Sequence, residues 1–153
     1  NLLPYKALPP ASMAQLKTYG KLGGALLLSG SYLGTDTKSE EERLFMDEML
    51  GVRAPGRVAN DTLEGVWGMN TPIELYNLPN ATHYFVQHTD VLEPTKSTAF
   101  SVFSYGKGGF SAGVANAEDM QRSITLGFPF ECIKDETLRK YVMQGALKYL
   151  LKK

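Results

Sequence analysis

The sequence A-L-L-L-S-G-S-Y-L-G-T-D, from Ala25 to Asp36, decides how the chain is interpreted. Its four apolar residues, Ala25 to Leu28, are too few for a helix and do not alternate with polar residues, so they predict a strand buried on both faces. A polar, glycine-containing turn follows. Ligands bind at the carboxyl ends of strands in parallel α/β sheets, so we expect any binding site in this turn. The expected ligand-binding residues are Ser29, Ser31, Tyr32 and Asp36.

The composition predicts one ordinary domain without a polyanionic partner. The chain has 153 residues, of which 43% are hydrophobic, and its 16 basic residues balance 16 acidic ones. Nothing in that balance attracts nucleic acid, and no apolar run reaches the roughly 20 residues that cross a bilayer. We expect no cofactor, because no G-x-G-x-x-G links a strand to a helix, and no metal, because the histidines lack zinc-site spacing.

Helices and strands are predicted along most of the chain. Capping boxes predict helices at Ser12, with Gln15, and at Ser39, with Glu42, and Asp135 is the expected N-cap of the last helix. Residues 51–79 are irregular, with short strands near 65–67 and 73–76. Further strands are expected at 83–88, where 90–94 ends the strand, at 98–105 and 110–115 as a hairpin, and at 123–128. We predict a three-layer αβα, flavodoxin-like sheet with an antiparallel hairpin extension, forming one domain over 1–153.

One group of residues suggests a hydrolytic site. Ser31 is a candidate nucleophile and His88 a candidate base, with Asp90 or Glu93 as the orienting carboxylate. The alternative is a tight turn in which Asp36 and Asp90 accept hydrogen bonds from backbone amides. Trp67 has two interpretations as well, a ligand platform or ordinary packing. The sequence leaves these alternatives open.

Three segments resemble the class I glutamine amidotransferase-like domain, in the version found in secreted bacterial xanthan lyase-like proteins. They are I-T-L-G-F-P-F-E (Ile124 to Glu131), G-G-A-L-L-L-S-G-S-Y-L-G-T-D (Gly23 to Asp36) and D-V-L-E-P (Asp90 to Pro94). The resemblance covers the second half of that domain, so it implies the C-terminal part of a larger protein. It also implies an amidotransferase-like sheet.

The same resemblance argues against the chemistry of that family. Its closing motif carries a histidine and a glutamate, but Pro129 stands at the histidine position here and only Glu131 matches. The nucleophile turn has no cysteine. We therefore expect a non-catalytic module of a secreted or periplasmic protein, with a scaffolding or carbohydrate-associated role. The expected partners are other domains of the same protein, carbohydrate, or a second copy bound through an uncovered sheet edge. The rival hypothesis is a hydrolase that uses Ser31, His88 and Asp90.

Overall fold

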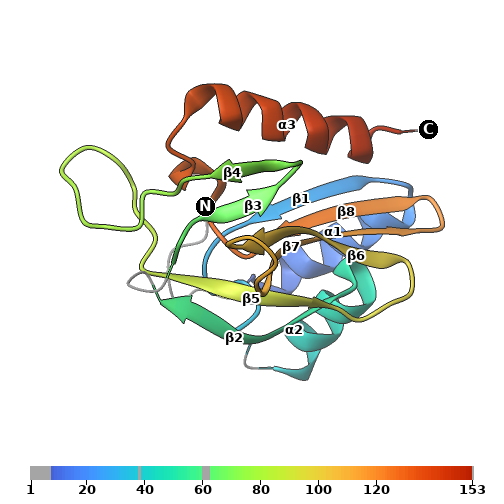
Figure 1. Ribbon diagram of the computed structural model, residues 1–153. Coiled ribbons are helices and arrows are strands. Elements are labelled where there is room, and N and C mark those ends of the chain that lie inside the picture. Colours follow the sequence, from blue (N-terminus) through green and yellow to red (C-terminus); the bar gives the residue numbers. More distant parts are fainter. Residues whose placement is uncertain (1–7, 38, 60–62, 153) are drawn as a thin grey trace.

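The computed structural model describes residues 8–37, 39–59 and 63–152. Figure 1 shows the chain order, which confirms an α/β fold. The elements are α1 (Pro10–Lys21), β1 (Ala25–Ser29), α2 (Glu40–Leu44), η1 (Phe45–Leu50), β2 (Val52–Ala59), β3 (Val66–Gly68), β4 (Thr71–Ile73), β5 (His88–Pro94), β6 (Ala99–Tyr105), β7 (Ser111–Glu118), β8 (Gln121–Leu126), η2 (Phe130–Cys132) and α3 (Glu136–Leu150). The last helix and the β6–β7 hairpin lie where the sequence predicts them, and the last strand, predicted at 123–128, lies two residues earlier. Over the described ranges, every helix is too short or too polar to span a bilayer.

The main sheet is mixed rather than parallel. Among the described residues its six strands run in the order β1-β8-β7-β6-β3-β4, and β1–β8 is the one parallel pair. The flavodoxin-like part of the predicted fold is therefore not confirmed. Within the described residues β1 pairs with β8 alone, so it is an edge strand, and four of its five residues are only half-buried. The prediction that this strand is buried on both sides holds for Leu26 and fails for its neighbours.

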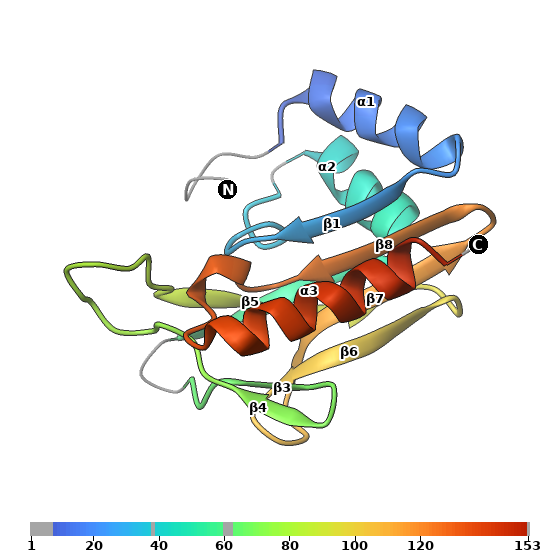
Figure 2. The same cartoon turned by 90° about the horizontal axis from the view of Figure 1, so that it is seen from above.

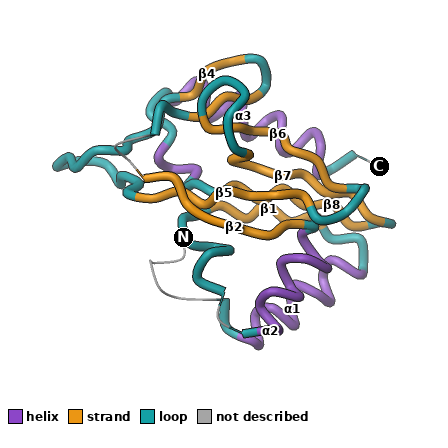
Figure 3. Tube along the Cα trace, turned by 60° about the horizontal axis from the view of Figure 1, so that its bottom comes forward, coloured by secondary structure: helices purple, strands orange, loops and turns teal. Residues whose placement is uncertain are grey.

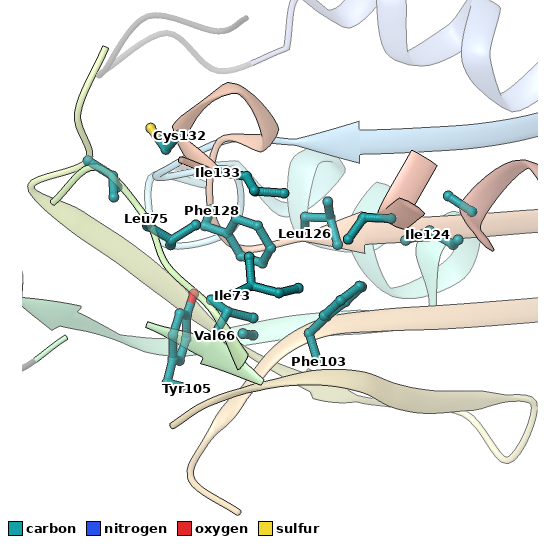
Figure 4. Close-up of a cluster of buried hydrophobic side chains, with 14 of the residues drawn as sticks. Val66, Ile73, Leu75, Phe103, Tyr105, Ile124, Leu126, Phe128, Cys132 and Ile133 are labelled. Atoms are coloured by element: carbon teal, nitrogen blue, oxygen red, sulfur yellow. The ribbon is translucent and has the colours of Figure 1, made fainter. Parts of the chain in front are cut away.

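Helices cover both faces of this sheet, as Figure 2 shows. On one face α3 contributes Val142, Ala146 and Leu150 to the larger buried cluster. Figure 4 shows Phe128, Leu126 and Ile73 within that cluster. On the other face α1 and η1 form the second cluster around Phe45 and Leu50. Neighbouring residues of one strand, such as Val114 and Ala115, enter different clusters, since strand side chains alternate between faces.

A separate two-stranded ribbon, β2–β5, packs beside the main sheet (Figure 3). The sequence did not predict β2, because Pro55 and Gly56 interrupt its strand pattern. The structure accommodates them with a register shift between Arg53 and Gly56. The predicted strand 83–88 is wrong: the strand starts at His88 and includes the segment that was expected to end it. The antiparallel register places Arg57 opposite Asp90.

The two predicted capping boxes have different outcomes. Ser39 accepts a hydrogen bond from the Glu42 amide, and the Glu42 carboxylate accepts one from the Ser39 amide, so this box is confirmed. The box at Ser12 is wrong. Proline is favoured in the first helical turn, and α1 already begins at Pro10, which leaves Ser12 inside the helix.

This difference predicts that two serine substitutions change stability by different amounts. Ser39→Ala removes a helix cap and is expected to lower the free energy of unfolding by about 1 kcal/mol. Ser12→Ala replaces a helix-interior serine with the best helix former, so it is expected to be neutral or slightly stabilising. Urea unfolding of both variants checks this pair. An equal loss in both would contradict the capping assignment.

Candidate functional site

The turn after β1 is fixed to the far end of the chain by Ser29. Its hydroxyl donates to the Phe128 carbonyl at 3.2 Å and accepts from the Phe130 amide at 2.6 Å. Serine is short enough to bond main-chain groups on both sides of a turn, so this hydroxyl joins β1 to the segment after β8. Ser29 was predicted to bind a ligand; here its polar atom is already engaged by the main chain.

The carboxylate of Asp90 lies fully buried beneath the same turn. One oxygen accepts from the Gly34 amide at 2.9 Å, and the other accepts from the Thr35 hydroxyl at 2.7 Å. Burial raises the pKa of Asp90, while the hydrogen bonds from Gly34 and Thr35 and the charge of Arg57 act in the opposite direction. The sequence-based alternative, in which Asp36 and Asp90 accept from turn amides, matches Asp90 through the Gly34 amide, whereas Asp36 pairs with Arg57.

The main chain around Asp90 is held as firmly as its side chain. Its amide donates to the Gly127 carbonyl at 2.7 Å, and its carbonyl accepts from the Tyr105 hydroxyl at 2.8 Å. Burial raises the pKa of Tyr105, so its hydroxyl remains a donor at neutral pH. Asp90 is therefore a junction at which β5, β6, the end of β8 and the turn meet.

Arg57 of β2 connects this junction to the surface. Its Nε donates to the Thr35 hydroxyl at 2.6 Å, its terminal nitrogen pairs with Asp36 at 2.5 Å, and its guanidinium lies 4.2 Å from the centre of the Tyr32 ring. Arg57 Nε is also 4.0 Å from the Asp90 carboxylate. Arg57 was not predicted as a site residue because β2, the strand that carries it, was not predicted. Recognising the β2–β5 pair would have placed it opposite Asp90.

The predicted catalytic residues lie near one another without forming the predicted hydrogen bonds. The exposed His88 has its Nδ1 3.1 Å from the Tyr32 hydroxyl, and Asp90 uses both oxygens on the turn. The Ser31 Oγ is buried and has no hydrogen-bond partner among the described residues. Glu131 lies in η2 and is half-buried. The structure thus brings Tyr32, Asp36, His88 and Asp90 around Arg57.

Tyr32 is one of the four non-glycine residues with positive φ among those described, at 63°. Such a conformation is strained for a bulky residue. The turn maintains it through the contacts of Tyr32 with Arg57 and His88. No three histidine, cysteine, aspartate or glutamate side chains within the described ranges are grouped to hold a metal ion.

Arg57 also lines a cavity of about 520 Å³. Gly106, Gly109 and Phe110 of the β6–β7 turn line it as well, together with Glu64. A volume of this size is within the range of small-molecule pockets. The sequence predicts this turn as part of a hairpin only, since no local signal places Arg57 at the same cavity.

Comparisons with known proteins find similarity in structure but not in sequence. No protein-family model and no curated protein matches the chain. Three similar solved structures are the β-galactosidases Gan42B of family GH42 from G. stearothermophilus, one from Rahnella sp. R3 and one from the haloarchaeon Halorubrum lacusprofundi. Their TM-scores are 0.63, 0.62 and 0.61, with 14%, 15% and 15% identity.

The alignments cover 94%, 97% and 94% of this chain, but 20%, 22% and 20% of the enzymes. The chain therefore spans about a fifth of their length, and the likeness concerns the fold alone. It corrects the sequence-based resemblance, since the matching structures are β-galactosidases and not amidotransferase-like or xanthan lyase-like domains. Two of the segments that suggested the amidotransferase-like resemblance have a structural role here, because the Phe130 amide donates a hydrogen bond to the Ser29 hydroxyl. The secreted or periplasmic location, inferred from that resemblance, stays a prediction. What the chain shares with solved proteins is the fold of one part of GH42-type β-galactosidases.

Proposed function

We propose that this chain is a non-catalytic, carbohydrate-associated module of a larger protein. The observation that carries the non-catalytic part is the bonding of Asp90. Both carboxylate oxygens bond the turn, and the Nδ1 of His88 lies 3.1 Å from the Tyr32 hydroxyl instead of against Asp90. A base needs an orienting partner and a nucleophile within reach. The carbohydrate association is supported by the fold likeness to β-galactosidases over nearly the whole chain.

The proposed partners are other parts of the same protein. Within the described residues the outer edge of β1 has no neighbouring strand. Unpaired backbone groups along an edge strand are a place where another segment adds to a sheet. We infer that the module contacts its neighbours through this edge. The polar junction around Asp90 then fixes the end of β1 that such a neighbour meets.

One observation favours the rival hydrolase. Ser31 has a buried hydroxyl without a partner, directly before a residue with positive φ. Strained turns of this kind occur at nucleophiles as well as in purely structural positions. The rival therefore predicts a reactive Ser31.

A serine-directed fluorophosphonate probe separates the two hypotheses. We expect no labelling of the chain, with trypsin in the same tube as the positive control. We also expect wild type and Ser31→Ala to hydrolyse p-nitrophenyl acetate at the same rate. Labelling that disappears in Ser31→Ala, or faster hydrolysis by wild type, would contradict the non-catalytic function.

A further inference from the structure

A separate cavity of about 130 Å³ lies between α3 and the face of the main sheet that α3 covers. Its buried lining comes from strands and helix together, and consists of Phe103, Ala115, Ile124, Val142 and Ala146. All five belong to the larger hydrophobic cluster, and Figure 4 shows Phe103 and Ile124 within it. Half-buried residues complete the lining, so the cavity reaches from the core to the surface.

Small side chains on two packed elements account for this cavity. Ala115 of β7 and Ala146 of α3 both line it, together with Gly145 of α3. Protein interiors are close-packed, and gaps larger than a water molecule are few in a domain. Side chains of valine or leucine size at the two alanines would occupy much of this space. The residues present instead leave a volume close to that of an engineered apolar cavity of about 150 Å³ that binds benzene.

Met69 lines the cavity from the two-residue turn between β3 and β4. Its φ is 53° and that of Asn70 is 61°, a conformation that favours glycine, asparagine or aspartate at both positions. The methionine side chain nevertheless lies against α3, because a Cβ built on Gly145 would collide with the Met69 Cε. Methionine is flexible and repacks easily, so this half-buried side chain is able to move aside for a ligand.

Tyr149 supplies the one polar side chain of this lining among the described residues. Its ring meets Phe100 edge to face, with the ring centroids 6.1 Å apart, and the Arg122 guanidinium lies 5.7 Å from the ring centre. Its hydroxyl oxygen is buried and has no hydrogen-bond partner among the described residues. A polyol or a charged ligand would exchange many hydrogen bonds with water for at most one here, which opposes binding. The lining therefore favours an apolar ligand.

We propose that this cavity binds a small apolar molecule that contains a single ring. Side chains of the sheet and α3 surround the ring, and Met69 covers it from the hairpin turn. Burying six CH groups, each treated as about one methylene, corresponds to a dissociation constant on the order of 1 mM or below. The inference goes beyond the carbohydrate-associated function and is independent of it, since it rests on the cavity residues alone.

Urea unfolding of the full chain with benzene as the probe tests binding. A ligand that binds only the folded chain shifts the unfolding equilibrium by mass action. Benzene at ten times its dissociation constant is therefore expected to lower the unfolding equilibrium constant about tenfold. Sodium benzoate carries the same ring with a charge, and is expected to have no such effect. An absent benzene effect, or an equal effect of benzoate, would overturn the proposal.

Filling the cavity tests where benzene binds. Ala115→Val and Ala146→Leu add carbon atoms inside it, so each is expected to reduce the benzene effect from about tenfold to below about twofold. Ala117→Val makes the same change two residues further along β7, at a position outside the lining, and is expected to keep the tenfold effect. A full benzene effect in both filling variants, or its loss in Ala117→Val, would overturn the site.

Methionine methyl NMR locates benzene in the unaltered chain, whether or not the filling variants fold. Met69 lines the cavity, whereas Met13, Met46 and Met49 belong to the cluster on the other face of the sheet. The ring current of bound benzene is expected to shift the Met69 methyl signal saturably and to leave the other three in place. Met69→Leu identifies the signal. An unshifted Met69 signal, or equal shifts in all four methionines, would overturn the site.

Discussion

Replacing Asp90 by alanine is expected to lower the free energy of unfolding by about 3 kcal/mol at neutral pH. The substitution leaves the Gly34 amide and the Thr35 hydroxyl without their acceptor, and removes a negative charge beside Arg57. Unpartnered buried polar groups each cost about 1–3 kcal/mol, and breaking a buried charged cluster costs similar amounts. Urea unfolding followed by Trp67 fluorescence measures the loss.

Asp47→Ala is the matched control, since Asp47 is an exposed aspartate in η1. Its effect is expected to stay within about 0.5 kcal/mol, as for most surface substitutions. If Asp90→Ala proved as stable as this control, Asp90 would not be the junction that holds the turn.

The same residue gives stability a defined dependence on pH. Burial raises the pKa of Asp90 above its ordinary 3.8. Between the ordinary and the raised pKa the unfolded chain has released a proton that the folded chain retains. Stability therefore falls as pH rises across this window and levels off above it. The asparagine in the Asp90→Asn variant cannot titrate. The free energy of unfolding of wild type minus that of the variant is therefore expected to decrease as pH rises across this window. An increase would contradict a raised pKa of Asp90.

A second large effect is expected for Gly127→Ala, with a loss of about 3 kcal/mol or more. Gly127 lies between β5 and β7, accepting from the Asp90 amide and donating to the Ala112 carbonyl. A Cβ here would lie 2.1 Å from the Asp90 carbonyl oxygen. The obstructing atom belongs to the backbone, so relief requires moving a strand, which places this case at the costly end of overpacking.

Gly56→Ala is the control for Gly127→Ala. Gly56 also lies in a strand, but no heavy atom is within 4 Å of a Cβ built there. We expect a change within about 0.5 kcal/mol in urea unfolding, as for a surface position. Equal losses in the two variants would show that lost glycine flexibility, rather than the contact with Asp90, determines the effect.

Local signals in the sequence predict the elements whose causes are local. The 25–28 strand, the Ser39 box and the Asp135 cap depend on residues within a few positions, and all three are present. β2 is different. Its Pro55 and Gly56 are poor strand residues, and pairing with β5 forms the strand despite them.

The candidate site was predictable to a similar degree. The turn and Asp90 were identified, because glycine and polar residues after an apolar run are visible in sequence. Arg57 and the Glu64–Phe110 cavity were not, because they depend on long-range register and on which turn faces which strand. The order of strands in the sheet also depends on long-range contacts, because no residue near Ala25 indicates that β1 lies at an edge of the described sheet.

The pairing of β1 with β8 has a consequence for how quickly the chain folds. Ala25 pairs with Arg122 and Ser29 with Leu126, and the Ser29 hydroxyl bridges residues 99 and 101 positions away. Forming a contact between such distant residues costs the entropy of closing a large loop before the contact stabilises the fold. Folding is therefore slower in proteins with a larger share of long-range contacts. A ribosome releasing this chain would have to synthesise β8 before β1 could find its partner. Until β8 has been synthesised, β1 therefore remains unpaired, and chaperones or other chains can bind its exposed backbone during that interval.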